Sequence, residues 1–263
     1  MSKIISIANQ KGGVGKTTTA INLAASIALS GKKVLLIDVD PQGNASSGLG
    51  IAEDAKGVYE LMMGEASMEE VTCSTEIETL KIIPSRVDLT GAEIELVTRE
   101  SREKVLKREL THMSEYEFVV IDCPPSLGLL TLNALAVSNS VLIPMQCEYY
   151  ALQGLSHLLK TLKLVKKSIN PDLKVEGILL TMFDSRTLLA TQVKDQVQKY
   201  FSDFLLKSII PRNVRLSEAP SHGKPIMLYA GRSRGADAYV ELAKEIISRS
   251  KTETKTSLTG SAA

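Results

Sequence analysis

The chain has 263 residues, of which 44% are hydrophobic and 23% charged, and its formal net charge is +1. This length suits one α/β domain with a large core, and the absence of a run of about 18 apolar residues argues against a membrane-spanning helix. We expect no signal peptide because a strand is predicted from Lys3 onward. The scattered Cys73, Cys123 and Cys147 argue against a disulfide framework or a zinc site and suit the cytosol.

Charge is unevenly distributed along the chain. Residues 1–159 carry 13 Lys and Arg against 20 Asp and Glu, whereas residues 160–250 carry 16 against 9. The second half therefore predicts a basic region that can meet a polyanion. The alternative is that the charges of its basic helices are simply exposed to solvent and keep the protein in solution.

The first predicted elements are a strand over 3–8, a glycine-rich turn and a helix over 17–29. Glycines let backbone N–H groups converge on phosphate oxygens, and the helix N-terminus adds partial positive charge. In this arrangement Lys16 would reach the β- and γ-phosphates, and the Thr17 hydroxyl would bind Mg²⁺ directly. The pattern therefore predicts a site for the phosphates of a nucleotide, which the resemblance described below implies is ATP. Its residues are Lys11, Gly12, Gly13, Val14, Gly15, Lys16, Thr17 and Thr18.

The turn departs from the standard phosphate-loop pattern at its start. The pattern requires a glycine where this chain has Gln10, and the chain carries a second lysine, Lys11, instead. This sequence resembles that of the deviant Walker A ATPases. The resemblance implies that Lys11 is catalytic and reaches the nucleotide of a partner subunit in a face-to-face dimer.

The next predicted strand, over 33–38, leads into Asp38 and Asp40. Strand, helix and strand with short connections predict a right-handed parallel crossover, and open α/β sheets bind ligands at the carboxyl ends of their strands. Two carboxylates there can serve the water bound to Mg²⁺ and the attacking water. The resemblance assigns Asp40 to the hydrolytic water and Asp38 to the metal through water. Taken alone, Asp-x-Asp is equally compatible with a simple turn.

The middle of the chain carries one further candidate. We expect short helices over 58–63 and 68–71, a strand over 80–83 and charged amphipathic helices over 88–95 and 99–113. An apolar strand over 116–122 then ends in Asp122. This is a Walker B position, in which the carboxylate holds a water of the Mg²⁺ shell.

In the second half, strands are predicted over 140–144 and 175–182, with a basic-faced helix over 151–167 between them. No long element is predicted over 209–225, where Pro211 and Asn213 are candidates for binding the adenine of ATP; a tight surface loop is the alternative. The last helix is predicted over 235–249. The polar residues 251–263 predict a disordered tail, which leaves residues 1–250 as one ATPase domain.

Over residues 3–248 the chain resembles the ParA/Soj-type chromosome-partition ATPases. The segments that carry the resemblance are 11–18, 38–44, 121–127, 146–152, 181–186 and 210–225. It implies a single α/β P-loop NTPase domain with a mostly parallel twisted sheet and helices on both faces.

The resemblance also implies the activity and its partners. The chain would hydrolyse ATP slowly with Mg²⁺, form a homodimer on ATP and bind double-stranded DNA nonspecifically as the dimer. A ParB/Spo0J-type partner would stimulate hydrolysis, and the protein would be cytoplasmic and nucleoid-associated. For DNA contacts the resemblance points to Arg186 and Arg215. Lys224, Arg232 and Arg234 are further candidates, with solvated surface charges as the alternative for each.

The alternative function is that of a MinD-like ATPase, which shares the dimer chemistry but binds membranes through a C-terminal amphipathic helix. Residues 250–256 have no apolar face, so no membrane partner is expected. Iron–sulfur carriers would require paired cysteine ligands, and a small-molecule kinase would require a lid with paired arginines. Neither pattern is present in the sequence.

Overall fold

The computed structural model describes residues 2–110 and 113–260. Within them, eight strands form one sheet in the order β3-β4-β2-β5-β1-β6-β7-β8. All neighbouring strands are parallel except β3 and β4, so the predicted α/β class with a mostly parallel sheet is confirmed. The strands are β1 (Lys3–Ile7), β2 (Val34–Asp38), β3 (Cys73–Ser74), β4 (Leu80–Ile83), β5 (Phe118–Asp122), β6 (Ser140–Gln146), β7 (Lys174–Phe183) and β8 (Leu205–Pro211).

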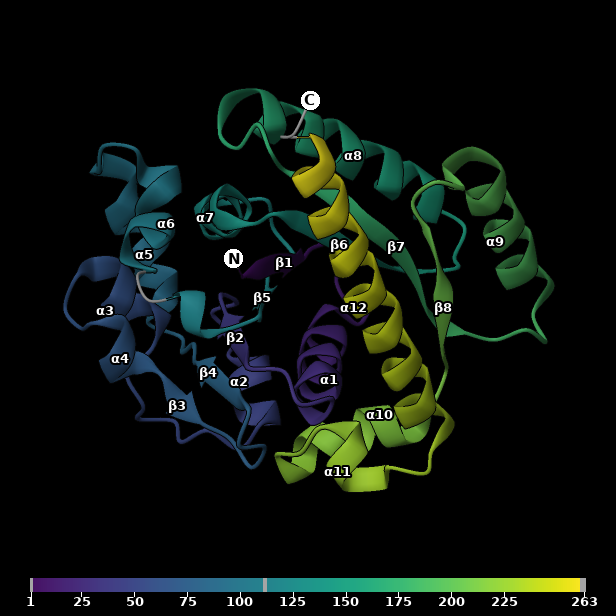
Figure 1. Cartoon of the computed structure of the whole chain (residues 1–263), viewed down its shortest axis with the longest axis horizontal. Helices are drawn as coiled ribbons and strands as arrows, with labels where there is room; N and C mark the ends of the chain where they lie inside the picture. The colour runs from purple at the N-terminus through teal and green to yellow at the C-terminus, as the bar shows by residue number, and fades with distance from the viewer. Residues whose placement is uncertain (1, 111–112, 261–263) are drawn as a thin grey trace.

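Helices cover both faces of the sheet (Figure 1). The helices α1 and α12 pack together on one face, whereas α7, α8 and α9 cover the other face and α3 to α6 extend this layer toward β4. The helices are α1 (Lys16–Leu29), α2 (Asn44–Gly48), α3 (Val58–Met63), α4 (Met68–Val71), α5 (Leu89–Glu95), α6 (Val105–Glu109), α7 (Leu129–Val137), α8 (Ala151–Ser168), α9 (Leu188–Phe201), α10 (Val214–Glu218), α11 (Ile226–Ala230) and α12 (Arg234–Gly260). Short 3₁₀ turns are η1 (Leu96–Thr98), η2 (Arg102–Lys104), η3 (Met113–Glu115) and η4 (Ala219–His222).

The central strands are almost wholly apolar because both of their faces are covered. Every residue of β2 and β5 is buried, as is typical of parallel strands between two helix layers. Along α1, the small residues Ala20, Ala24 and Ala28 are fully buried against the sheet and α12. The sequence of these elements therefore suits a three-layer fold, in which helices cover both faces of the sheet.

The register of the central strands brings the predicted acidic residues together. Asp38 at the end of β2 pairs in register with Asp122 at the end of β5, and Ile7 of β1 also pairs with Asp122. The glycine-rich turn after β1 thus starts beside both carboxylates. The site forms at the carboxyl edge of β1, β2 and β5.

The prediction of one continuous helix over 99–113 is wrong. The segment divides into η2 and α6, followed by η3, and residues 111–112 lie outside the described part. Ser101 has a left-handed backbone (φ 49°), and the Leu106 N–H donates to Asn133 Oδ1 at 3.0 Å. The Leu106 N–H therefore bonds to a side chain of α7 and not to a backbone carbonyl of a preceding helical turn. The charge pattern of the segment does not predict this contact.

The segment predicted to be a loop over 209–225 contains the end of β8, α10 and η4. Asn213 caps α10, because its Oδ1 accepts the Arg215 N–H at 2.9 Å. Helices of this length are too short to show a periodic apolar pattern. Neither α9 nor the start of β8 is predicted from the sequence.

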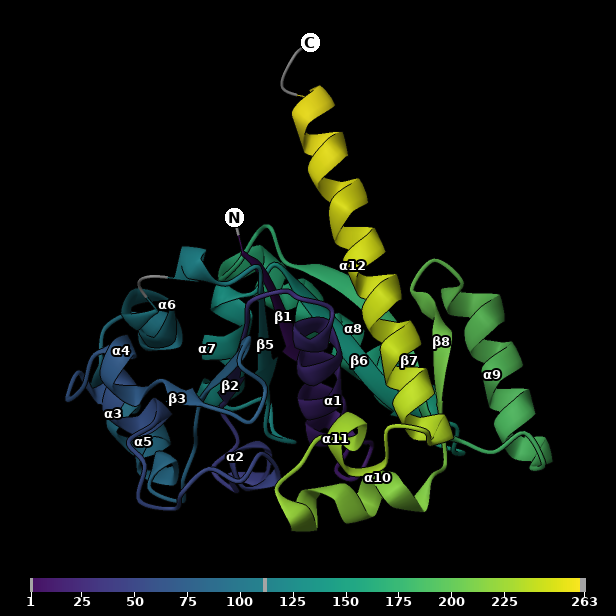
Figure 2. The ribbon, with the colours of Figure 1, turned by 60° about the horizontal axis from the view of Figure 1, so that its bottom comes forward.

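The last helix is longer than its predicted range of 235–249. It continues through Gly260 and projects beyond the body of the molecule (Figure 2). No proline and no further glycine interrupts it before Gly260, and each added residue extends an existing helix by one hydrogen bond. The predicted boundary at residue 250 remains a prediction, and residues 261–263 lie outside the described part.

A buried ion pair joins strands at the amino edge of the sheet. Lys3 Nζ in β1 lies 2.8 Å from Glu176 Oε2 in β7, and the Ser140 hydroxyl of β6 donates to the same oxygen at 2.5 Å. Glu176 is 6% exposed. The carboxylate therefore links three adjacent strands.

Substitution of Glu176 should destabilise the fold. Glu176→Ala is expected to lower the free energy of unfolding by about 3 kcal/mol, because Lys3 loses its buried carboxylate and Ser140 its acceptor. Urea unfolding measures this value. The control is Glu241→Ala, which removes an exposed pair with Lys244 and should cost less than about 0.5 kcal/mol. Equal losses in the two variants would contradict the buried role of Glu176.

Candidate nucleotide site

The turn between β1 and α1 has the backbone of a phosphate cradle. Gly13 and Gly15 have left-handed backbones, with φ of 72° and 83°, which side chains other than glycine rarely adopt. A Cβ atom added at Gly12 or Gly13 would meet no atom within 4 Å, so the space above the turn is open. Because α1 begins at Lys16, its free N–H groups face that space.

Lys16 is the buried cation of the site. Its side chain is largely covered, and its Nζ donates to the Lys11 carbonyl oxygen at 3.2 Å across the turn. Burial lowers the pKa of Lys16, and the nearby charges of Asp122 and Asp40 oppose this shift. A phosphate in the cradle would give this ammonium group a stronger acceptor than a carbonyl.

Neighbouring strands hold the turn in place. The Thr181 hydroxyl in β7 donates to the Val14 carbonyl at 2.8 Å, and Asn9 Nδ2 donates to the Pro144 carbonyl of β6 at 2.7 Å. Thr181 lies in the family segment 181–186, but no role is predicted for it from the sequence. No local pattern could reveal it, because the two bonded residues are 167 positions apart.

Asp38 is fully buried and holds α2 against the site. Its Oδ2 accepts the N–H groups of Ala45 and Ser46 at 3.1 and 2.9 Å and the Ser46 hydroxyl at 2.8 Å. Burial raises the pKa of Asp38 to about 6 against these stabilising bonds, and the charge of Asp40 adds to the shift. The predicted contact of Asp38 with metal through water remains a prediction beside this structural role.

Asp122 is fully buried, and neither of its carboxylate oxygens has a hydrogen-bond partner among the described residues. Burial raises the pKa of Asp122 well above its usual value, and Asp38 raises it further, whereas Thr17 and Lys16 oppose the shift. Unpartnered buried oxygens are rare and require an explanation. A hydrated Mg²⁺ beside Thr17 would explain the unpartnered oxygens of Asp122, because its waters would donate to them. This ion usually retains several waters and is bound by few protein groups together with phosphates.

This fit does not depend on a dense cluster of protein ligands. Among the described residues, no group of three or more His, Cys, Asp and Glu side chains could hold a metal ion. Such a group is needed for an all-protein cage and not for a magnesium ion that bridges phosphates. The residues present therefore suit Mg²⁺ only together with a nucleotide.

Asp40 lies in the turn after β2 and is almost buried. Its Oδ1 accepts the Gln42 N–H at 3.0 Å, and its own N–H donates to Asp38 Oδ1 at 3.2 Å. The turn thus ties the two carboxylates to each other. This arrangement holds Asp40 close enough for its charge to affect Lys16, and its catalytic role remains a prediction.

Lys11 differs from Lys16 in its exposure. It forms an ion pair with Glu148, in the turn after β6, and about half of each side chain is exposed. Glu148 lies in the family segment 146–152, but its pair with Lys11 is not predicted from the sequence. One lysine of the loop therefore points into the site and the other lies at its rim.

Known proteins resemble this chain over nearly its full length. A family model described as an AAA domain matches residues 2–175. The Bacillus subtilis sporulation initiation inhibitor protein Soj is 59% identical over 94% of this chain and 98% of its own length. The chromosome partitioning protein ParA of Myxococcus xanthus is 56% identical over 95% and 89%. The chain belongs to the Soj/ParA family of chromosome-partitioning ATPases.

A solved structure gives the same fold as this Soj/ParA chain. The cobyrinic acid a,c-diamide synthase of Mycobacterium smegmatis with bound ADP and magnesium has a TM-score of 0.84 and 36% identity, covering 96% of this chain and 97% of its own. The predicted P-loop NTPase fold is therefore confirmed. Among the described residues of this Soj/ParA member, no helix is both long and apolar enough to span a bilayer.

The candidate adenine residues lie at the same edge of the sheet as the phosphate loop. Pro211 ends β8, where it pairs in register with Phe183, and Asn213 follows it. Because Asn213 Oδ1 caps α10, its amide nitrogen is the group that could meet a base. Their role in binding adenine remains a prediction.

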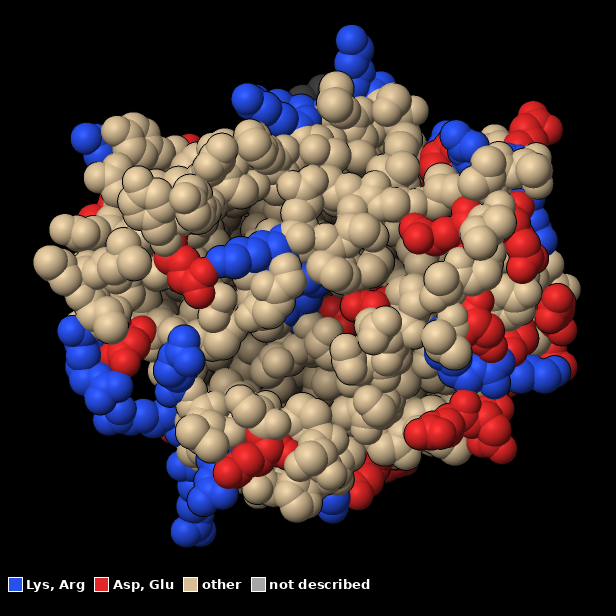
Figure 3. All heavy atoms as spheres, turned by 180° about the vertical axis from the view of Figure 1, so that it is seen from behind, with Lys and Arg blue, Asp and Glu red and all other residues tan. Residues whose placement is uncertain are grey.

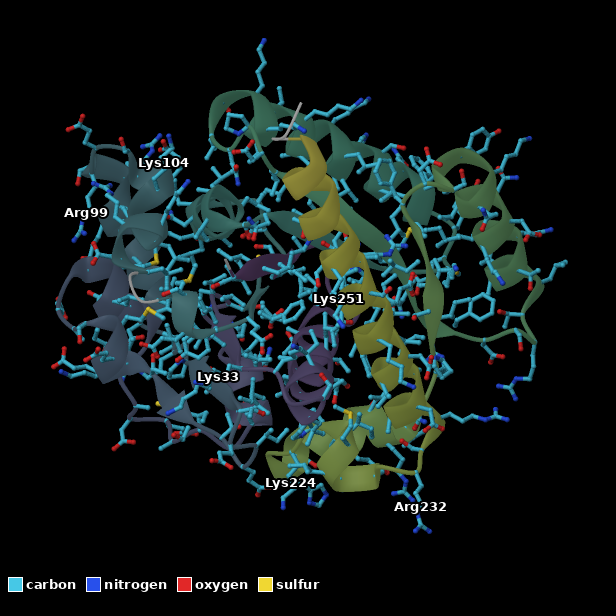
Figure 4. All side chains as sticks on the ribbon, viewed as in Figure 1. Lys33, Arg99, Lys104, Lys224, Arg232 and Lys251 are labelled. Carbon is cyan, nitrogen blue, oxygen red and sulfur yellow. The ribbon has the colours of Figure 1, made fainter. Side chains whose placement is uncertain are left out.

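Acidic neighbours neutralise three of the candidate DNA-binding residues. Arg186 forms two bonds with Asp184, at 2.8 and 2.7 Å, while Arg215 pairs with Glu218 at 2.8 Å and Lys224 with Glu76 at 3.1 Å. Lys224 and Arg232 lie at the end of the molecule formed by α10 and α11, where Arg232 points away from the body (Figure 4). Arg234 is exposed at the start of α12.

The raised pKa of Asp38 predicts a pH-dependent stability. The unfolded pKa is near 3.9, so the folded protein binds this proton more tightly and the resulting stabilisation is lost as the pH rises from about 4 to about 6. Asp38→Asn cannot ionise. The free energy of unfolding of Asp38→Asn, taken relative to that of the native protein, should therefore be about 1–3 kcal/mol higher at pH 7 than at pH 4.

Denaturant unfolding of the nucleotide-free protein at the two pH values measures this difference. The comparison of the two pH values also cancels the pH-independent loss of stability caused by placing an amide next to the Asp40 N–H. Asp203→Asn, on an exposed turn, is the control and should show the same effect at both pH values. If Asp38→Asn also shows the same effect at both pH values, the raised pKa of the buried Asp38 carboxyl is contradicted.

Proposed function

We propose that this Soj/ParA member forms a face-to-face dimer on Mg²⁺-ATP, binds double-stranded DNA nonspecifically as the dimer and leaves DNA when a ParB/Spo0J-type partner stimulates its slow hydrolysis. It acts in the cytoplasm on the nucleoid. The observation that carries the proposal is the pair of lysines on one phosphate loop. Lys16 is buried beside the carboxylates, whereas Lys11 is exposed at the rim.

Within one subunit, the loop N–H groups and Lys16 bind the phosphates, and Asp40 orients the water that attacks the γ-phosphate. When Mg²⁺ is bound by Thr17 and, through water, by Asp38 and Asp122, it offsets the charge that develops on the phosphate oxygens. The low exposure of Asp40 excludes bulk water from this position. The hydrogen bonds of Asp40 to its own turn hold it there.

The role of Lys11 lies between subunits. Two γ-phosphates that face each other across a dimer repel, and a lysine contributed by each subunit to the other's nucleotide offsets that repulsion. To do so Lys11 must leave Glu148. Half-exposed ion pairs contribute little, so a multiply charged phosphate can displace the carboxylate. Loss of the γ-phosphate removes the partner of Lys11 and opens the dimer.

Apolar side chains at the same rim support burial by a second copy. Tyr149 and Tyr150 directly follow Glu148 and are 77% and 70% exposed, with their rings edge to face. Leu188 and Leu189 at the start of α9 are also exposed. Exposed aromatic and aliphatic residues around a charged anchor are typical of protein interfaces.

Glu148→Gln should strengthen the ATP-dependent dimer. The amide no longer holds Lys11 by charge, so we expect the dimer to form at about 2- to 5-fold lower protein concentration, in line with about 0.5–1 kcal/mol for an exposed pair. Light scattering with a nonhydrolysable ATP analogue and Mg²⁺ measures the change.

The control for this experiment is Glu117→Gln, which removes a similar pair with Lys32 at the opposite edge of the sheet. It should leave dimerisation unchanged. Lys11→Ala should bind nucleotide but remain a monomer. A monomeric native protein at saturating analogue would refute the dimer itself.

DNA binding needs no base-reading element, because affinity grows with the number of phosphates neutralised. Dimerisation doubles the basic surface and converts weak contacts into useful binding. Lys and Arg side chains gather at one lower corner of the face in Figure 3, on the side of α9, whereas Asp and Glu gather on the side of α3 to α6. This separation agrees with the charge difference between the two halves of the sequence.

Arg186→Ala and Arg215→Ala should each reduce retention on random-sequence DNA several-fold with ATP, while ATP-dependent dimerisation persists. Retention is measured with ATP, ADP and no nucleotide at two salt concentrations, and it should fall with salt. Arg102→Ala, on η2, is the control and should retain DNA binding. Unchanged retention of both variants would remove these residues from the DNA surface, and binding to anionic vesicles in place of DNA would favour the MinD-like alternative.

A further inference from the structure

The end of β7 carries a strained backbone beside the phosphate loop. Among the described residues, Met182 and Ser101 are the only ones besides glycine with a positive φ, of 48° and 49°. This left-handed conformation crowds Cβ against the backbone and costs energy in any residue with a side chain. Such strain persists where the surrounding structure holds it, and it clusters at functional sites. The position of Met182 next to a binding site therefore points to a role in that site.

The strained residue lies in a β-bulge of β7. Leu180 pairs in register with Ile209 of β8 and Phe183 pairs with Pro211, so three steps along β7 match two steps along β8. One extra residue is thus inserted between Leu180 and Phe183. We call residues 181–182 the β7 bulge. An inserted residue exchanges the faces of all side chains that follow it and bends the strand, so the bulge decides where the chain after β7 is directed.

Both residues of the β7 bulge approach the phosphate loop. The Thr181 hydroxyl donates to the Val14 carbonyl at 2.8 Å. Thr181 Cβ and Met182 Cε each lie 3.9 Å from the position that a Cβ atom at Gly15 would take. Successive side chains of a regular strand point to opposite faces, so the irregular backbone explains how two neighbours reach the same glycine. Gln146 Nε2 donates to Met182 Sδ at 3.1 Å and holds the thioether from β6.

The residue after the bulge holds the candidate adenine segment. The Phe183 carbonyl accepts the Arg212 N–H at 3.2 Å, and Phe183 pairs in register with Pro211. Asn213, whose amide nitrogen could meet a base, follows directly. Residues 181–183 thus connect the phosphate loop on one side with the adenine candidates on the other.

We propose that Met182 is a positioning residue whose left-handed backbone sets the separation between the phosphate loop and the adenine candidates Pro211 and Asn213. When this separation fits a nucleotide, the contacts to its phosphates and to its base form together and support each other. A backbone that leaves the left-handed region moves Phe183 and the segment bonded to it. The inference rests on the nucleotide site of the proposed function, through the predicted adenine contacts, and not on dimerisation or DNA binding.

Met182→Val tests the role of the backbone, because a β-branched residue strongly disfavours positive φ. We expect the affinity for ADP with Mg²⁺ to fall about 10-fold, as for the loss of one strong hydrogen bond to the base. The affinity for inorganic pyrophosphate with Mg²⁺ should change less than about 2-fold, since the loop retains its bonds from Thr181 and Asn9. Isothermal titration calorimetry of the full chain measures both affinities, and neither ligand carries the γ-phosphate proposed to drive dimerisation.

Met182→Gly is the rescue variant, because glycine adopts positive φ without strain. Its ratio of ADP affinity to pyrophosphate affinity should stay within about 2-fold of the native ratio, although the thioether is absent. Ser101→Val is the matched control, since Ser101 has the same backbone conformation at the start of η2. It should lower the free energy of unfolding without changing the ratio of the two affinities.

A native ratio in Met182→Val would overturn the role of Met182, as would equal losses in Met182→Val and Met182→Gly. Asn213→Asp tests the adenine contact separately, because it retains the oxygen that caps α10 and loses the amide nitrogen. A lowered ratio in Asn213→Asp beside a native ratio in Met182→Val would overturn the inference and leave the adenine contact in place. Native ratios in both variants would overturn both, whereas light scattering and DNA retention test the proposed dimer and DNA binding independently.

Discussion

The buried charges around Lys16 are the constraint on which the rest of this structure depends. One ammonium group faces three almost fully buried carboxylates, those of Asp38, Asp40 and Asp122. One cation cannot balance three acids in a medium of low polarity, and the raised pKa values of Asp38 and Asp122 express this deficit. A divalent ion supplies positive charge where the free oxygens of Asp122 lie. The site is therefore built to be completed by Mg²⁺ and a nucleotide together.

The parallel sheet explains how residues from distant segments reach this cluster. The strands β1, β2 and β5 are neighbours, and their carboxyl ends place the phosphate loop, Asp38 and Asp122 at one edge. The next strands, β6 and β7, bring Glu148 to Lys11 and Thr181 to the loop backbone. Helices on both faces bury the strands, so the edge is rigid where the chemistry takes place.

Charge is separated between two sides of the molecule. The side with α3 to α6 carries many Asp and Glu residues, whereas the side with α9 carries many Lys and Arg residues. This separation follows the sequence, in which residues 1–159 are net acidic and residues 160–250 are net basic.

By itself, the sequence determined the fold class, the phosphate loop and the acidic ends of β2 and β5. Each of these features can be recognised from a few consecutive residues. An apolar strand, a glycine-rich turn and an aspartate at the end of a strand indicate the same local structure whatever their neighbours in the sheet are. The short helix α10, the break before α6 and the continuation of α12 had no such pattern, because tertiary contacts and helix propagation decide them. The pair of Lys11 with Glu148 depends on tertiary structure alone, as do the oxygens of Ser85 and Asp88 that have no hydrogen-bond partner within residues 2–110 and 113–260. These features depend on the distance between atoms far apart in the chain, which the order of residues does not specify.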